Sequence, residues 1–293
     1  MKFRTGSNIN GTTAMNRSEP TARLKARFKC NAGKNQMDEC FASAPLKIAK
    51  TFALDDEFGA GIGVCVMDCS PGMLAGDHYD FEWHLGENSH VLATTQGFTR
   101  VHPSRDNSCR LKQKITLEDG AILDFCPGAL QLFAGASIRT ECKVEMTDSS
   151  VLMWSEITSA GRIGRGEIFQ FHEFQSRLRV SCDGKPIFRS QTALRPREVT
   201  PRRVAAWGEW SHNGNFYVFS PRAGEELLQF LRELLEQNAQ VWGGASLLER
   251  NGVAVSLLGH RAHDLEAITQ KLRVATLQYL KIKPQNGEIA GVA

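Results

Sequence analysis

The feature that most constrains this chain is a long series of short segments in which apolar and polar residues alternate. Leu24, Ala26 and Phe28 are separated by basic residues, and residues 79–84 repeat the alternation with aromatic side chains. Strict alternation is typical of a half-buried β-strand. Runs of about five to eight residues, with turns roughly every 8 to 12 residues, favour an all-β body. A single sheet this wide would curl or split, so the strands must stack in layers or wind around a core.

Three dipeptides between these segments carry the signal of a two-residue hairpin turn. Glycine follows Asp or Asn in each, a combination that tolerates the positive φ angles such turns require. We therefore expect each dipeptide to join two strands that pair with each other. The dipeptides are Asp119-Gly120, Asp183-Gly184 and Asn251-Gly252.

The last third of the chain adds helices. Ser220 and Pro221 predict a helix start, and Glu225 and Glu226 suit the positive end of its dipole. An apolar stripe predicts a second helix from about residue 264 to 280. The expected organisation is a disordered polar tail at 1–20, a β body at 21–200, a helix-containing segment at 201–285 packed on that body, and a flexible tail at 286–293.

A second unusual stretch combines glycines with fixed charges. Gly161, Gly164 and Gly166 alternate with Arg162 and Arg165, and Glu167 follows directly. A plain turn needs one or two glycines and no charges. No Lys-Ser/Thr pair follows, as a phosphate-binding loop requires, and residues 168–172 alternate like a strand rather than opening a helix. Nucleotide binding is therefore disfavoured. A bend whose arginines pair with carboxylates and a site for a small anion both remain open.

Charge, apolar runs, cysteine spacing and the absence of known motifs exclude or disfavour several classes of function. A net charge of +3 implies no broad field for nucleic acid or membranes, and no apolar run approaches the ~20 residues that span a bilayer. The N-terminus has no apolar signal segment, so a cytoplasmic protein is expected. The eight scattered cysteines then favour free thiols. No metal-binding or catalytic motif of known spacing occurs, and Asp77, Glu156 and Glu167 flank turns without a pairing that spacing defines.

Four sequence blocks follow one another along the chain: residues 71–77 (PGMLAGD), 94–102 (TTQGFTRVH), 120–127 (GAILDFCP) and 161–169 (GRIGRGEIF). In this order they resemble the urease accessory protein D family (UreD, also called UreH). Each block alone is weak, but the ordered set is specific, and the resemblance extends over roughly residues 21 to 280. One departure is that Pro71 and Ala75 interrupt the glycine-rich first block.

The resemblance implies a mainly β fold: a layered, β-helix-like winding of short strands with two α-helices and a hairpin in a C-terminal segment. It also implies a non-catalytic chaperone of urease maturation. Such a protein acts with the accessory proteins UreF and UreG on apo-urease and assists nickel delivery. No cofactor is expected to stay bound, although Ni²⁺ passes transiently. Alternatives are a small-anion-binding enzyme that uses the Gly/Arg bend, and a purely structural partner of UreF.

The matching blocks supply the candidate residues. A transit path must bind Ni²⁺ weakly enough to release it, so scattered carboxylates suit it better than a dense Cys/His cage. Asp77 and Glu167 each follow a glycine in a matching block and are the candidates for metal transit. The remaining motif residues are expected to shape the bends and surfaces; they are Gly76, Thr95, Gln96, Gly161, Arg162, Gly164, Arg165 and Gly166.

Overall fold

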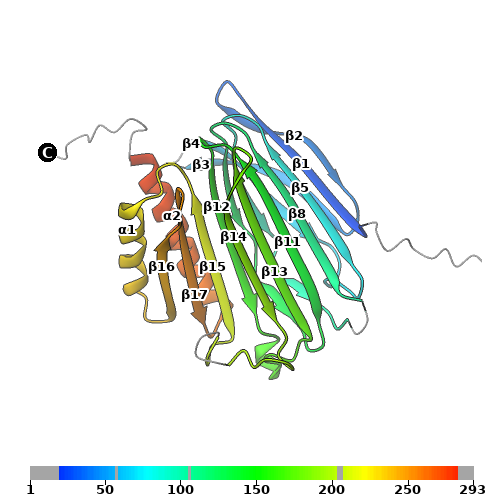
Figure 1. Cartoon of the computed structure of the whole chain (residues 1–293). Coiled ribbons are helices and arrows are strands. Elements are labelled where there is room, and N and C mark those ends of the chain that lie inside the picture. The colour runs from blue at the N-terminus through cyan, green and yellow to red at the C-terminus, as the bar shows by residue number, and fades with distance from the viewer. Residues whose placement is uncertain (1–19, 57–58, 105–106, 203–206, 283–293) are drawn as a thin grey trace, which may run out of the picture.

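The computed structural model describes residues 20–56, 59–104, 107–202 and 207–282. The predicted tails at 1–20 and 286–293 lie outside this part, except for Pro20. Within it, two large sheets face each other and two helices lie outside one of them (Figure 1). No helix of the described chain is both long and apolar enough to span a membrane.

The seven-stranded sheet is called sheet A, and the ten-stranded sheet is called sheet B. From edge to edge, sheet A contains β14 (Lys185–Leu194), β13 (Glu173–Cys182), β11 (Ser137–Met146), β8 (Cys109–Leu117), β5 (His78–Leu85), β1 (Ala22–Asn31) and β2 (Lys34–Ala42). The main path of sheet B contains β16 (Val241–Leu247), β17 (Gly252–Gly259), β15 (His212–Phe219), β12 (Val151–Ser159), β9 (Ile122–Cys126), β6 (His90–Thr95), β4 (Gly59–Asp68) and β3 (Leu46–Asp56). Two short strands complete it, β7 (Thr99–Val101) and β10 (Leu130–Leu132), which pair with each other, while β10 also pairs with β12.

The chain winds between the two sheets. At each step along the series β4, β5, β6, β8, β9, β11, β12 and β13, the chain crosses from one sheet to the other. The short strands β7 and β10, which lie between members of this series in the chain, stay with sheet B. Successive strands within each sheet are parallel along this path, as in β5 beside β8 and β6 beside β9. The predicted layered, β-helix-like winding of short strands is therefore confirmed.

The turn at Asp119-Gly120 corrects one prediction. It joins β8 in sheet A to β9 in sheet B, so its flanking strands do not pair with each other. Instead the turn stacks on the preceding turn of the winding: Asn88 N donates to Asp119 O at 2.8 Å, and Ile122 N donates to Ser89 O at 2.7 Å. Gly120 does supply the positive φ (67°) that the dipeptide indicates. The Asp-Gly dipeptide therefore predicts the local backbone conformation of the turn, but it does not predict which strands pair with each other.

The other two dipeptides form the predicted hairpins. Asp183-Gly184 joins the antiparallel strands β13 and β14, and both residues have positive φ. Asn251 is the last residue of the connection 248–251 between the antiparallel strands β16 and β17, and Gly252 is the first residue of β17. Residues 168–172, by contrast, form bends where the alternation predicts a strand, and β13 begins only at Glu173. The main-chain groups of Phe169 and His172 bond instead to loop carbonyls, at Ala160 and Ala136.

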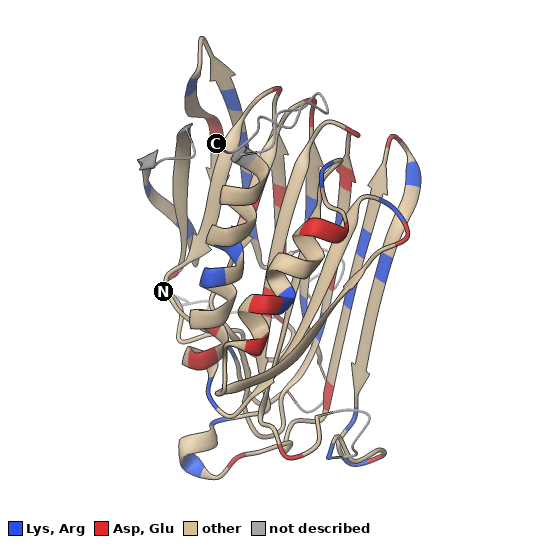
Figure 2. Cartoon of the chain, turned by 90° about the vertical axis from the view of Figure 1, so that its left-hand side faces the viewer, with Lys and Arg blue, Asp and Glu red and all other residues tan. Residues whose placement is uncertain are grey.

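Two helices cover the outer face of sheet B (Figures 1 and 2). They are α1 (Glu225–Glu236) and α2 (Ala262–Ile282). Helix α1 begins at Glu225, with Gly224 as its N-cap, and not at Ser220-Pro221 as predicted. Ser220 instead belongs to a separate turn, in which Ala223 N donates to the Ser220 carbonyl at 2.9 Å. Strands β15, β17 and β16 continue sheet B beyond β12, so the described C-terminal segment shares hydrogen bonds with the winding.

The core has two layers, one between the sheets and one between sheet B and the helices. Strand β1 buries Leu24, Ala26 and Phe28 in the first layer and exposes the basic residues between them, as the alternation predicts. Strand β12 is buried on both faces: Trp154 points between the sheets, and Met153 packs in the layer beneath the helices. This double burial explains why residues 151–154 form a continuous apolar run.

Candidate functional site

Three of the four motif blocks lie in loops at one end of the molecule, where the chain leaves sheet B and enters sheet A in each turn of the winding. The remaining block, residues 120–127, starts at the opposite end, forms β9 and reaches this end only at its last two residues. Main-chain hydrogen bonds join the loops of this end: Met73 N donates to Arg100 O at 2.8 Å, and Thr99 N donates to Ala129 O at 3.0 Å. We call this end the motif end. Its loops are 69–77, 96–104 with 107–108, 127–136 and 160–172, with β7, β10 and the 3₁₀ helix Ile163–Arg165 among them.

The Gly/Arg bend is closed by its own ion pair. Arg162 Nε donates to Glu167 Oε2 at 2.8 Å, and Arg162 Nη2 donates to Glu167 Oε1. The guanidinium also lies 4.3 Å from the centre of the Phe133 ring, and Ala134 N donates to Glu167 Oε2 at 3.2 Å. The predicted pairing of the bend's arginines with carboxylates is thus confirmed for Arg162, whereas Arg165 is exposed and forms no salt bridge with a carboxylate of the described residues. Because a bidentate pair neutralises its cation, the guanidinium of Arg162 is not available to a small anion.

The remaining residues of the bend have different surroundings. Gly164, Arg165 and Gly166 are exposed. Gly161 is buried with a φ of 153°, and a Cβ placed there would lie 1.9 Å from Glu167 O. Only glycine permits this close approach of two backbone segments.

Asp77 and Thr95 also make structural contacts at the motif end. Asp77 Oδ2 accepts a hydrogen bond from Leu74 N at 2.7 Å, which closes the turn that contains Gly76 at a φ of 86°. Thr95 Oγ1 accepts from Gly128 N at 2.8 Å, while Gln96 is exposed. Asp77 and Glu167 lie in different loops, and no hydrogen bond or ion pair joins them in the described chain.

The ion pair at the bend yields a pH prediction. Hydrogen bonds from Arg162 hold the pKa of Glu167 below its ordinary value. A carboxyl with a lowered folded pKa adds stability above its unfolded pKa, about 4.3, and this contribution is lost as pH falls through the folded pKa. We expect Arg162→Gln to raise the pKa of Glu167 towards its ordinary value. Carbon-13 NMR titration of the Glu167 carboxyl in both proteins measures this change, and equal pKa values would contradict the assigned pairing.

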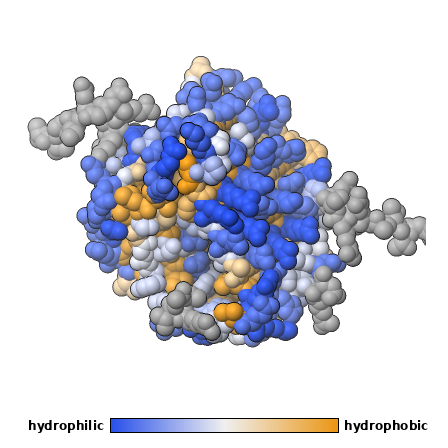
Figure 3. Space-filling view, in the orientation of Figure 1, coloured by the Kyte–Doolittle hydropathy of each residue, from blue (hydrophilic) through white to orange (hydrophobic). Residues whose placement is uncertain are grey.

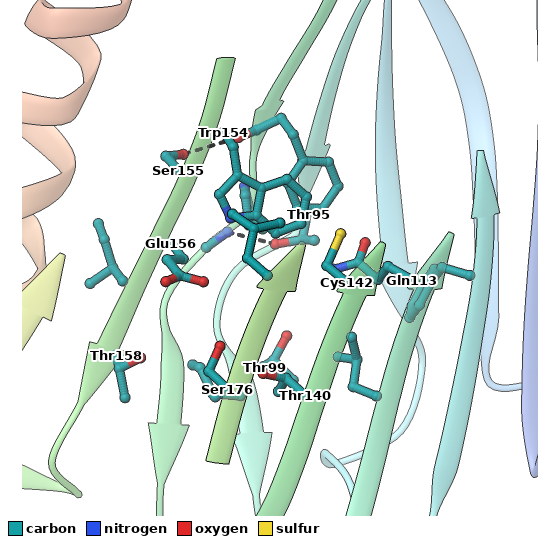
Figure 4. A pocket seen from close by; sticks show the side chains of 18 of the residues that line it. Thr95, Thr99, Gln113, Thr140, Cys142, Trp154, Ser155, Glu156, Thr158 and Ser176 are labelled. Atoms are coloured by element: carbon teal, nitrogen blue, oxygen red, sulfur yellow. Dashed lines mark hydrogen bonds between the residues drawn. The ribbon is translucent and has the colours of Figure 1, made fainter. Parts of the chain in front are cut away.

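Between the two sheets, the interior is hollow. A cavity of about 120 Å³, enough for several water molecules, is lined from both sheets. Figure 4 shows Glu156 and Cys142 on different sides of this hollow, with the hydroxyl groups of Thr140 and Ser176 nearby. A second cavity of about 80 Å³ shares several lining residues with the first and reaches the motif end at Gln96 and Phe98. The shared lining residues are Val66, Phe81, Thr95, Thr99 and Leu111.

Glu156 is an acidic residue of this hollow that the sequence did not single out for metal transit. It lies on β12, shares the inward face with Trp154, and accepts a hydrogen bond from Asn215 Nδ2 at 3.0 Å. Burial raises the pKa of Glu156, and burial together with the charges of Glu156 and Glu141 raises the pKa of the Cys142 thiol. The two-residue offset from Trp154 is the sequence signal that places Glu156 inside.

A residue of the third motif block holds a helix to the winding. Asp124 on β9 accepts a hydrogen bond from Arg273 Nε of α2 at 2.6 Å, and the two side chains are 2% and 10% exposed. Its sequence signal is a lone carboxylate within the apolar run 121–125. Buried carboxylates are rare unless paired, so such a residue indicates a partner.

The described residues contain no group of three or more His, Cys, Asp or Glu side chains placed to hold a metal ion. All eight cysteines are free thiols. The possible donors along the hollow, chiefly the carboxylate of Glu156, the thiol of Cys142 and several hydroxyl groups, are therefore dispersed along its wall.

Comparison with known proteins shows to which class of protein this chain belongs. The family model described as UreD urease accessory protein matches residues 20–289. A urease accessory protein UreD of Acetivibrio thermocellus is 29% identical over 252 residues, which cover 86% of this chain and 95% of that relative. The UreD of Actinobacillus pleuropneumoniae serotype 3 is 30% identical over 245 residues, covering 82% and 91%. A urease accessory protein UreH of Helicobacter pylori strain G27 is 26% identical over 270 residues, covering 92% and 100%.

These matches extend over the whole winding and the C-terminal helices. The strand-built, hollow fold is therefore that of a urease accessory protein. More particularly, the chain belongs to the UreD family, and the resemblance inferred from the four motif blocks is confirmed.

Proposed function

We propose that this chain is a non-catalytic, cytoplasmic chaperone that helps to load nickel into urease. In this proposal it binds apo-urease together with UreF and UreG, and Ni²⁺ passes through the hollow between sheets A and B. The observation that carries the proposal is the dispersed set of donors along the hollow, which includes Glu156, Cys142 and Thr140.

Dispersed donors suit a carrier because release matters as much as capture. Nickel bound by three or four converging His or Cys ligands would be held tightly and released slowly. A single carboxylate with neighbouring hydroxyls and waters binds a divalent cation weakly. Burial raises the pKa of the Glu156 carboxyl, so we expect protons and Ni²⁺ to compete for its oxygens.

Asp77 and Glu167 remain candidates for the outer part of the route. Both belong to loops of the motif end, where the second cavity reaches the surface region around Gln96. Each carboxylate already makes a contact that holds its loop, with Leu74 N for Asp77 and with Arg162 for Glu167. Replacing either residue therefore changes loop geometry as well as charge, which makes Glu156 the cleaner probe of transit.

The experiment measures nickel per active site of urease purified from a host that lacks this chain. The host is complemented with nothing, with the wild-type chain, or with Glu156→Gln. We expect nickel to be nearly absent without the chain and several-fold lower with Glu156→Gln than with the wild type. Glu145→Gln is the matched control, because Glu145 lies exposed on β11 and outside the hollow.

Co-purification with UreF, UreG and apo-urease determines whether Glu156→Gln still assembles. If urease has its full nickel content with Glu156→Gln but lacks nickel in the host without the chain, the proposal that nickel passes Glu156 would be overturned. That result would leave the chain as a structural partner of UreF.

A further inference from the structure

On the outer face of sheet A, four neighbouring strands place cations side by side, and the next strand, β5, places Glu82 in register with the first of them, Lys114. Lys114 on β8 is in register with Lys143 on β11, which is in register with Arg179 on β13, and Arg179 is in register with Arg189 on β14. The lysines and Arg189 are exposed, while Arg179 is half-buried. Neighbouring strands lie about 4.8 Å apart, so the four positions span roughly 14 Å. We call these four residues the basic row.

In the neighbouring row of the same face, the charges alternate in sign from strand to strand. The residues that follow one another in register there are Asp80, Lys112, Glu141 and Arg177. Like charges directly opposite each other destabilise a sheet, whereas opposite charges stabilise it. The basic row therefore does not serve the stability of the sheet.

Little within the described chain neutralises the basic row. Glu141 Oε1 lies 3.9 Å from Lys143 Nζ and 3.7 Å from Arg179 Nη1, so one carboxylate is shared by two cations. Arg189 donates to the neutral amide of Gln191 at 2.9 Å. Glu82 is in register with Lys114, but it forms its salt bridge with Lys25. The hydrogen bond from Lys25 and, in addition, the charge of Lys114 lower the pKa of Glu82. Among the described residues, no carboxylate forms a salt bridge with Lys114 or Arg189. The row thus presents excess positive charge to its surroundings.

The surface around the row is suited to a charged partner. Figure 3 shows a broad hydrophilic area over the strands of sheet A, in the orientation of Figure 1. The net charge of the whole chain is only +3, so the excess is local. Carboxylates in the adjacent row, Asp80 and Glu141, would repel a uniform polyanion such as a nucleic acid. A protein surface can instead place carboxylates on the row and basic groups beside it.

We propose that the basic row is a docking site for an acidic helix of a partner protein. Carboxylates at every fourth position of an α-helix repeat about every 5–6 Å along one face, close to the spacing of the strands in the row. A helix laid across β8, β11, β13 and β14 therefore sets one carboxylate against each cation. This surface is independent of the hollow and of nickel transit.

The test uses the full chain and a fluorescently labelled, alanine-rich helical peptide with four glutamates spaced four residues apart. Fluorescence anisotropy at low salt is expected to show binding of this peptide and none of a peptide with glutamines in their place. Binding should weaken as salt approaches about 0.15 M, because exposed charges are then screened. Lys143→Glu/Arg179→Glu is expected to weaken binding about tenfold or more.

Lys34→Glu/Lys47→Glu is the matched control, because it changes the net charge equally but lies on β2 and β3. We expect less than about a twofold effect from it, since distant exposed charges are screened. An equal effect of both double variants would overturn the proposal, as would tighter binding of duplex DNA than of the glutamate peptide. Lys143→Gln/Arg179→Gln replaces the reversal variant if thermal unfolding shows that the latter is not folded.

Discussion

Replacing Asp124 with alanine is expected to destabilise the folded chain by about 3–5 kcal/mol. The substitution leaves the guanidinium of Arg273 buried without its carboxylate, because Arg273 Nε lies 2.6 Å from Asp124 Oδ2 and its side chain is only 10% exposed. An uncompensated buried charge loses its hydration without gaining a partner. Urea unfolding, followed by circular dichroism, measures the loss.

Two controls separate this explanation from a general loss of ion pairs. Glu82→Ala breaks the pair between Glu82 and Lys25, which has a similar length, 2.7 Å, but exposed side chains, so we expect a loss below about 1 kcal/mol. The double variant Asp124→Val/Arg273→Met removes both charges and should recover most of the stability. A small effect of Asp124→Ala, or no recovery in the double variant, would contradict a buried pair that fastens α2 to β9.

Gly161→Ala is the second substitution with a large expected effect, a loss of at least about 2 kcal/mol. The φ of 153° is unfavourable for a side chain, and the new Cβ would lie 1.9 Å from Glu167 O. The backbone of the bend must therefore move. That movement would break the bond from Phe169 N to Ala160 O, at 2.9 Å, and disturb the pair between Arg162 and Glu167.

Gly164→Ala is the matched control within the same bend. A Cβ at Gly164 meets no atom within 4 Å, and its φ is not positive, so we expect a change within about 0.5 kcal/mol. Thermal unfolding compares both variants with the wild type. Equal losses from the two substitutions would show that the bend is not held by close approach at Gly161.

Local features of the fold could be predicted from the sequence. The alternation around Leu24 and Phe28 fixes which face of β1 is buried, because side chains on a strand alternate strictly. Asp183 and Gly184 give a hairpin for the same local reason. Asp119-Gly120 has the same turn chemistry, yet it connects the two sheets, since the partner of each strand is set by the previous turn of the winding.

In the candidate site too, contacts between residues close in sequence could be predicted, and contacts between distant residues could not. Arg162 and Glu167 are five positions apart, so their pairing follows from a glycine-rich bend and was open to prediction. Asp124 and Arg273 are 149 positions apart, and nothing in either segment indicates the other. The hollow near Glu156 depends on how side chains of both sheets fill the space between them. Such tertiary packing has no periodic signal in the sequence.

Nickel content per active site of urease from a host that lacks this chain tests the central claim most directly. If the chain is a chaperone that loads nickel, urease from that host will contain its polypeptides but almost no nickel, and the wild-type chain supplied in trans will restore the metal. Urease that carries a full complement of nickel in the absence of the chain would contradict this account.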